Sequence, residues 1–150
     1  MIESSMELEL EVAEQVFIDS SFFIARFNKR DKFHKEAIEF ISKVREGRFQ
    51  FAFATSDYVF DETITTILYQ TKRHDVAEKC GETILKSRTL TMAYIDETLL
   101  RDAWQLFKER ADKLWSFTDC TSFTFMEKIG ARTALAFDEN FEEAGFIVKP

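Results

Sequence analysis

The feature that most constrains the fold is a set of short apolar runs, each stopping at a polar residue and followed by a helical pattern. Residues 16–18 are β-branched or aromatic and end at Asp19, and residues 133–137 end at Asp138. Runs of this length and composition are typical of buried strands. Because strands alternate with helices along the chain, the sequence predicts a mostly parallel sheet with helices on both faces.

Apolar periodicity and capping residues place the remaining elements. Strands are predicted over 16–18, 49–54, 89–95, 133–137 and 146–148. Helices are predicted over 33–44, 57–70, 75–86, 99–111 and 116–129, with a turn or short helix over 140–144. Ser20 and Ser21 offer capping oxygens for a turn that leads into residues 22–25. Since no proline precedes Pro150 and no Gly/Ser linker interrupts the chain, one compact domain is expected.

Acidic residues are concentrated at the N-terminus. Residues 1–15 carry five glutamates and no basic side chain, so the net charge of −7 falls to −2 for the rest of the chain. We therefore divide the chain into an acidic leader, 1–15, and a single domain, 16–150. The nearly neutral domain does not exclude a nucleic-acid partner, although phosphate binding depends on Lys and Arg.

A local basic stretch follows the first predicted strand. Residues 26–35 contain a single acid, Asp31, and five basic side chains: Arg26, Lys29, Arg30, Lys32 and Lys35. If the stretch stays near the strand end, it places positive charge beside Asp19 and can contact RNA phosphates. A solvated, charged start of a helix explains the same pattern equally well.

Several classes of site are disfavoured. No run of about 18 apolar residues could span a membrane, and the N-terminus lacks a signal-peptide pattern, so a cytoplasmic protein is expected. Cys80 and Cys120 are too far apart in sequence for a CxxC metal site. His34 and His74 do not form an i, i+4 pair, which disfavours a zinc site of the metalloprotease kind.

Four carboxylates, Asp19, Glu62, Asp119 and Asp138, are the candidate functional residues. Three of them lie at strand ends or helix starts, and Glu62 lies within the helix predicted over 57–70. Strand ends and helix starts gather at one edge of a parallel sheet, so these acids can meet in one crevice. Carboxylate oxygens are the ligands that Mg²⁺ and Mn²⁺ prefer. Any one of them alone could instead serve a helix N-terminus.

Four segments of the chain together resemble the PIN-domain family. They are Val-Phe-Ile-Asp-Ser-Ser-Phe at 16–22, Asp-Glu-Thr-Ile-Thr at 61–65, Ser-Phe-Thr-Asp-Cys-Thr-Ser-Phe at 116–123, and Ala-Phe-Asp-Glu-Asn-Phe-Glu-Glu-Ala-Gly-Phe at 136–146. The resemblance implies a Rossmann-like three-layer α/β/α sandwich. It also implies a Mg²⁺- or Mn²⁺-dependent ribonuclease, most often the toxin of a toxin–antitoxin pair, with an antitoxin partner and a homodimeric state.

The resemblance also assigns roles to individual positions. It makes all four carboxylates metal ligands and catalytic residues: Asp19, Glu62, Asp119 and Asp138. Ser20, Thr118 and Asn140 match supporting positions near the site, and RNA would approach over Arg26, Lys29, Arg30 and Lys32. Asp61 adjoins Glu62 but points about 100° away around the helix, so only one of the two can face the crevice fully.

Three other functions fit parts of the same pattern. One is a PIN-fold scaffold in RNA processing without hydrolysis, although clustered carboxylates repel one another and a scaffold does not need them. Another is a phosphatase with Asp19 as nucleophile, but the chain lacks the second acid of an Asp-x-Asp pair. The third uses Cys120 as nucleophile at a helix N-terminus, but no histidine lies nearby in sequence.

Overall fold

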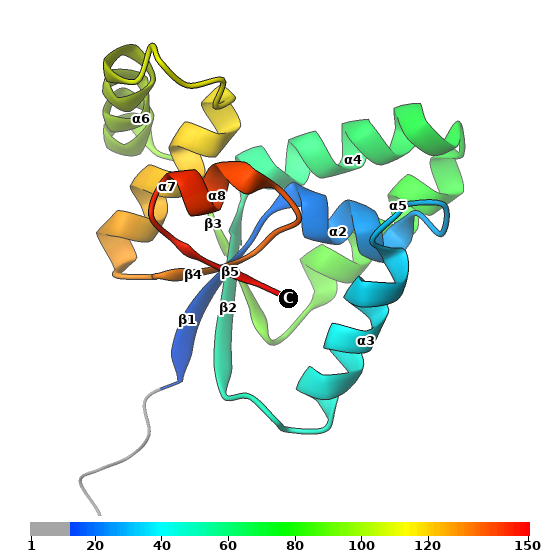
Figure 1. Ribbon diagram of the computed structural model, residues 1–150. Helices are drawn as coiled ribbons and strands as arrows, with labels where there is room; N and C mark the ends of the chain where they lie inside the picture. Colours follow the sequence, from blue (N-terminus) through cyan, green and yellow to red (C-terminus); the bar gives the residue numbers. More distant parts are fainter. Residues whose placement is uncertain (1–12) are drawn as a thin grey trace, which may run out of the picture.

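A computed structural model describes residues 13–150 as a five-stranded parallel sheet packed between two layers of helices (Figure 1). The strands are β1 (Glu14–Ile18), β2 (Phe51–Ser56), β3 (Leu90–Ala93), β4 (Thr133–Leu135) and β5 (Ile147–Lys149). The helices are α2 (Ser20–Phe27), α3 (His34–Arg45), α4 (Asp57–Thr71), α5 (His74–Lys86), α6 (Glu97–Glu109), α7 (Phe117–Ile129) and α8 (Glu139–Glu143). The alternating order predicted from the sequence is confirmed.

The order of the strands fixes where a ligand site can form. It is β3-β2-β1-β4-β5, so the chain builds outward from β1 to β3 and then returns to the other side of β1. The switch in direction lies between β1 and β4, where Ile18 pairs with Leu135. In open parallel sheets, ligands bind at the carboxyl ends of the strands at such a switch point. Asp19 and Asp138 both follow these two strand ends.

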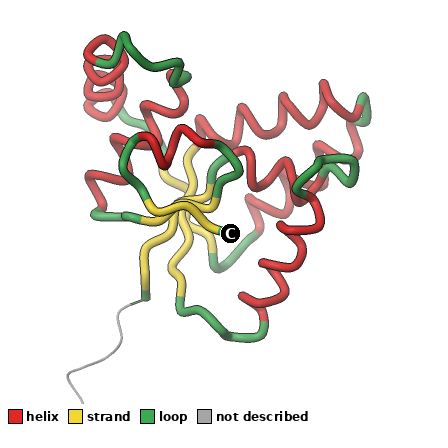
Figure 2. Tube along the Cα trace, viewed as in Figure 1, coloured by secondary structure: helices red, strands yellow, loops and turns green. Residues whose placement is uncertain are grey.

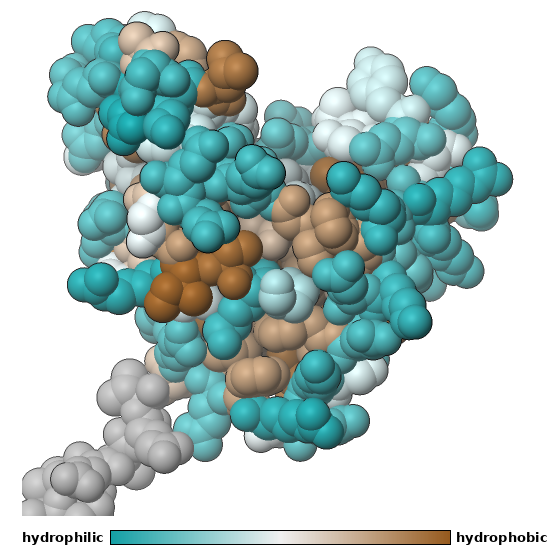
Figure 3. Space-filling model, viewed as in Figure 1, coloured by the Kyte–Doolittle hydropathy of each residue, from teal (hydrophilic) through white to brown (hydrophobic). Residues whose placement is uncertain are grey.

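Helices cover both faces of the sheet, so the three-layer sandwich expected from the sequence is confirmed. Helices α6, α7 and α8 lie on one side of the sheet and α2 to α5 on the other (Figure 2). Phe17 of β1 is fully buried and packs against Phe125 of α7 and Phe141 of α8. On the opposite face, Phe22 packs edge-on against Phe40. Hydrophilic side chains cover most of the surface in Figure 3.

Two boundaries near the N-terminus differ from the prediction. Strand β1 begins at Glu14, two residues early, because Glu14 pairs with Phe51 of β2. It therefore includes Glu14 and Gln15, which the sequence assigned to the leader; residues 1–12 lie outside the described part of the chain. The predicted turn after β1 is the eight-residue helix α2, and its N-cap is Asp19, not Ser20 or Ser21.

None of the helices within residues 13–150 combines the length and the apolar character needed to cross a membrane.

Phe17→Ala should lower the free energy of unfolding by about 3–5 kcal/mol, because it leaves a cavity between the sheet and the layer of α7 and α8. Urea denaturation measures this change. Leu85→Ala is the control, since Leu85 is 59% exposed and its truncation should change stability by no more than about 0.5 kcal/mol. Equal effects of the two substitutions would contradict this account of the core.

Candidate functional site

Asp19 is a buried carboxylate at the end of the central strand, and its two oxygens have different surroundings. Asp19 has an extended backbone and is the N-cap of α2. The residue is only 2% exposed. Its Oδ2 accepts hydrogen bonds from the backbone N–H of Ser21 at 3.2 Å and from the Ser21 hydroxyl at 2.7 Å. Its Oδ1 is buried and has no hydrogen-bond partner among residues 13–150. A buried polar atom left unpaired is costly, so Oδ1 is available to accept from water or to ligate a cation.

Asp119 is held by the first turn of α7. The Ser116 hydroxyl accepts from the Asp119 N–H at 3.0 Å, and Asp119 Oδ2 accepts from the Ser116 N–H at 3.1 Å. This reciprocal pair is a capping box, and it explains why the helix begins here. Asp119 is only 6% exposed, and the capping box fixes the orientation of its carboxylate.

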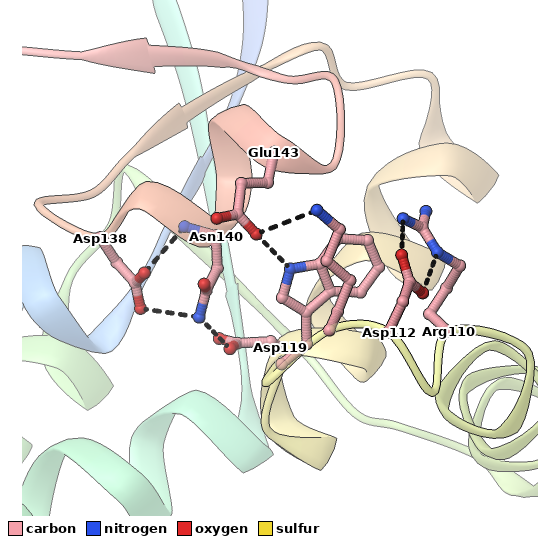
Figure 4. A network of polar contacts seen from close by, with 8 residues as sticks. Arg110, Asp112, Asp119, Asp138, Asn140 and Glu143 are labelled. Atoms are coloured by element: carbon pink, nitrogen blue, oxygen red, sulfur yellow. Dashed lines mark hydrogen bonds and ion pairs between the residues drawn. The ribbon is translucent and has the colours of Figure 1, made fainter.

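Asp138 is the N-cap of the short helix α8 and is joined to Asp119 by Asn140. Its Oδ1 accepts from the backbone N–H of Asn140 at 2.8 Å. The Asn140 side-chain amide donates to Asp119 Oδ2 at 2.9 Å and, with a longer contact of 3.5 Å, to Asp138 Oδ2. Figure 4 shows the amide lying between the two carboxylates. Asn140 therefore links the acid at the start of α7 with the acid after β4.

Glu62 reaches the group from the middle of α4. The Ser20 hydroxyl donates to Glu62 Oε2 at 3.0 Å, which ties the helix glutamate to the residue directly after Asp19. Glu62 is half-buried, whereas its neighbour Asp61 is exposed. The helix thus turns Glu62 toward the other three acids and Asp61 toward solvent.

The carboxylates are close enough to affect one another's protonation. Burial raises the pKa of Asp19 from its ordinary 3.8 to about 7; hydrogen bonds from Ser21 oppose this shift, and the charges of Asp119 and Glu62 add to it. Burial also raises the pKa of Asp119 and of Glu62, and neighbouring carboxylates increase both shifts. None of the ion pairs within residues 13–150 involves any of the four acids. The group is therefore negative and lacks a cationic partner.

The donors fit a hard divalent cation held partly through water. All are carboxylate oxygens, and Asp19 Oδ1 is unpaired. Within the described part of the chain, no three His, Cys, Asp or Glu side chains converge closely enough to ligate one ion by themselves. Mg²⁺ usually keeps several waters and takes only one or two carboxylates directly, so this looser spacing suits it. Cation binding would also offset both the burial cost and the repulsion between carboxylates that raise these pKa values.

The supporting residues differ in what they contact. Ser20 and Asn140 hydrogen-bond to site carboxylates, whereas no hydrogen bond from the Thr118 hydroxyl is found in residues 13–150. The Thr118 carbonyl accepts from Ser122 instead. Sequence reasoning treated Ser21 only as a helix cap and missed its contact with Asp19. The signal was present: a serine two residues after an Asp can return a hydrogen bond to it.

The basic stretch lies away from the carboxylates. Helix α2 separates Asp19 from the loop that carries Lys29, Arg30 and Lys32, a span of about 12 Å for eight residues. In that loop, Asn28 hydrogen-bonds to Gln70 near the end of α4. The positive charge is therefore not directly beside the acids, because the turn expected after β1 is a helix.

Arg26 and both main cavities are also separate from the acid group. Arg26 lines a 460 Å³ pocket with Phe22, Phe40 and two further cations, Arg45 and Lys86. A larger cavity of 670 Å³ lies between α6, α7 and the segment before β5, and none of the four carboxylates lines it. The carboxylates therefore lie outside both of these cavities, at the carboxyl ends of β1 and β4.

Cys120 does not suit a nucleophilic role. It is buried next to Asp119, and burial raises the pKa of its thiol to about 11, with the Asp119 charge adding to the shift. The reactive thiolate is therefore scarce near neutral pH.

Comparison with known proteins points to one family. The PIN domain family matches residues 16–147. The chain is 31% identical over 136 residues to the 23S rRNA-specific endonuclease VapC20 of Mycobacterium tuberculosis, covering 90% of this chain and 98% of that protein. It is 27% identical over 125 residues to a VapC ribonuclease of Archaeoglobus fulgidus, covering 83% of this chain and 77% of that protein.

Solved structures agree with this match. The crystal structure of M. tuberculosis VapC20, described as a Sarcin-Ricin loop cleaving toxin, superposes with a TM-score of 0.79 at 30% identity, covering 88% of this chain and 96% of that one. VapBC2 from Rickettsia felis, bound to a DNA fragment from its promoter, gives a TM-score of 0.63 at 13% identity, covering 90% and 97%. At that identity, the second match supports the fold alone.

Without divalent metal, the wild-type protein should lose stability relative to Asp19→Asn as the pH rises. The folded pKa of Asp19, about 7, lies above its ordinary 3.8, so between these values the unfolded chain ionises while the folded protein keeps the proton. Above pH 7 the folded protein carries the full cost of ionising Asp19, and the variant should be more stable by on the order of 4 kcal/mol. Urea unfolding at pH 5 and pH 8 in EDTA measures this, and a difference independent of pH would contradict it.

Proposed function

This chain belongs to the PIN domain family, and on that premise we propose that it is a Mg²⁺- or Mn²⁺-dependent endoribonuclease. The observation that carries the proposal is the group of four acids with an unpaired, buried oxygen on Asp19 and, among residues 13–150, no ion pair to neutralise any of them. Matches to a named rRNA endonuclease and a named ribonuclease over most of the chain support the reaction type. Three-quarters or more of each relative's length is covered.

We assign different roles to the four carboxylates according to their positions. Asp19, Asp119 and Asp138 would hold the cation, directly or through water. When bound, the cation would activate a water molecule and neutralise charge on the phosphate. Glu62 orients the attacking water and accepts its proton; because burial raises its pKa, the carboxylate is better matched to a proton acceptor near neutral pH. Asn140 keeps Asp119 and Asp138 at a fixed separation.

The proposed substrate is RNA, bound over an open surface. VapC20 is named as specific for 23S rRNA, and we propose a single-stranded or structured RNA as the substrate of this chain too. The exposed side chains of Lys29, Arg30 and Lys32 at the far end of α2 would contact phosphates upstream or downstream of the cut, and Arg26 would assist from the last turn of α2.

We also propose a toxin–antitoxin setting for this activity. The relatives are VapC proteins, and the solved structure of one of them, VapC20, is described as that of a toxin. An antitoxin partner, a homodimeric state and a cytoplasmic location follow from that setting. A short neighbouring gene that encodes a DNA-binding fold would support the antitoxin.

Cleavage of labelled single-stranded RNA with Mn²⁺ tests the catalytic proposal. EDTA should abolish cleavage, and Asp19→Asn should reduce its rate by more than about 100-fold, because a direct ligand should matter more than the outer-shell groups that typically cost 10–100-fold. Glu62→Gln should also be severely impaired. Asp61→Asn is its matched control, since Asp61 is the adjacent but exposed acid on the same helix.

Equal cleavage in Mn²⁺, in EDTA and by Asp19→Asn would reject the mechanism. If calorimetry also detects no Mn²⁺ binding at millimolar concentration, the result favours a non-catalytic PIN-fold scaffold instead.

Replacing Lys29 and Arg30 together by Ala should weaken RNA binding without changing the cleavage rate at saturating RNA, because helix α2, about 12 Å long, separates both from Asp19. Each lost phosphate contact should reduce the slope of log affinity against log salt by about 1. Binding is measured in EDTA by fluorescence anisotropy over a salt series. Lys79→Ala with Lys86→Ala, on α5, is the charge-matched control; an unchanged slope in the Lys29/Arg30 variant would remove this loop from the binding surface.

A further inference from the structure

The Ser21 hydroxyl joins the ends of the two strands that carry Asp19 and Asp138. It donates to Asp19 Oδ2 at 2.7 Å and accepts from the backbone N–H of Phe137 at 2.9 Å. Phe137 lies between the end of β4 and Asp138. A hydroxyl has one proton to donate and lone pairs to accept, so it satisfies both partners at once.

The backbone pairing between β1 and β4 stops before it reaches Phe137. The backbone N–H of Asp19 donates to the Leu135 carbonyl at 3.0 Å and so aligns the ends of β1 and β4. Within residues 13–150, Ala136 and Phe137, which follow Leu135, make no backbone hydrogen bond to β1. The Ser21 side chain continues the alignment past the last ladder pair, up to the residue before Asp138. Removing it would leave the Phe137 N–H without its partner and Asp19 Oδ2 with one donor instead of two.

The same contacts leave one oxygen of the Asp19 carboxylate free to bind a ligand. Oδ2 receives two hydrogen bonds from Ser21, through its N–H and its hydroxyl, while Oδ1 receives none. Because the two oxygens of a carboxylate are equivalent, a half-turn restores the same arrangement; what the two donors fix is the plane of the carboxylate and the position of the oxygen that points away from Ser21. Oδ1 is then the oxygen left for a ligand.

We propose that Ser21 is a positioning residue of the site: its hydroxyl orients Asp19 so that Oδ1 is presented to the cation, and it sets the distance from Asp19 to the loop that bears Asp138. The inference rests on the proposed metal-dependent function. Groups that orient metal ligands through hydrogen bonds typically affect metal affinity by 10–100-fold when they are removed. Ser21 itself contacts neither substrate nor cation.

Neighbouring Ser20 has a different role. Its hydroxyl donates to Glu62 Oε2 and to no other site carboxylate within residues 13–150. The two serines therefore hold different acids, and their substitutions should have different consequences for metal binding and for proton transfer.

Ser21→Thr and Ser21→Val form the deciding pair, because they have the same shape and differ only in the hydroxyl. Calorimetric titration with Mn²⁺, without RNA, should give Ser21→Thr an affinity close to that of the wild type and Ser21→Val an affinity lower by about 10–100-fold. Any steric strain from branching is common to the two variants. Ser122→Ala is a further control, since it removes a buried hydroxyl that donates to a backbone carbonyl and not to a carboxylate.

The outcomes separate this inference from the proposed function. Equal Mn²⁺ affinity of the Thr and Val variants overturns the role of Ser21 and leaves the ribonuclease proposal intact. No binding by the wild-type protein overturns both. If the Val variant is unfolded by circular dichroism, Ser21→Ala takes its place against the wild type, with the same expected loss of affinity and the same reading of an unchanged value.

Discussion

The arrangement of this protein depends on burying a carboxylate at the end of its central strand. Asp19 follows the strand that pairs with both β2 and β4, so its position is fixed by the sheet. Burial without a cation is unfavourable, and the raised pKa of Asp19 expresses that cost. The fold tolerates the cost because strands on both sides hold the backbone in place. The proposed cation site thus lies at the end of the central strand, where the sheet holds the backbone and burial of the carboxylate is unfavourable.

The acids also shape the local backbone. Asp19 caps α2, Asp119 forms half of the capping box of α7, and Asp138 caps α8. Each carboxylate therefore accepts a hydrogen bond from a backbone N–H at a helix start, where the partial positive charge of the helix N-terminus favours a carboxylate. The same interactions leave other lone pairs directed at the crevice. Structural and ligand-binding explanations of these residues are consequently compatible, although each acid considered alone suggests only the first.

Sequence patterns placed the strands well where the signal was local. The end of β1 follows from a short apolar run closed by Asp19, whereas β4 ends at Leu135, two residues before the predicted end at Phe137. Glu62 could be separated from Asp61 only through the family resemblance, because helix periodicity gives relative directions and not the direction of the sheet edge. The basic loop was placed too close to the acids, since residues 20–25 give too short an apolar pattern to distinguish a turn from a helix.

The tripeptide Asp19-Ser20-Ser21, which follows β1, orients side chains from three elements of the fold. Successive residues of a helix point about 100° apart, so the side chains of Ser20 and Ser21 cannot serve the same carboxylate. Ser20 reaches across to Glu62 on α4, and Ser21 turns back to Asp19 and onward to the β4 end. Three elements distant in sequence are therefore aligned by two adjacent hydroxyls. Because this alignment depends on the first turn of α2, a substitution that unwinds that turn would disturb Asp19 and Glu62 together, even though neither side chain had been changed.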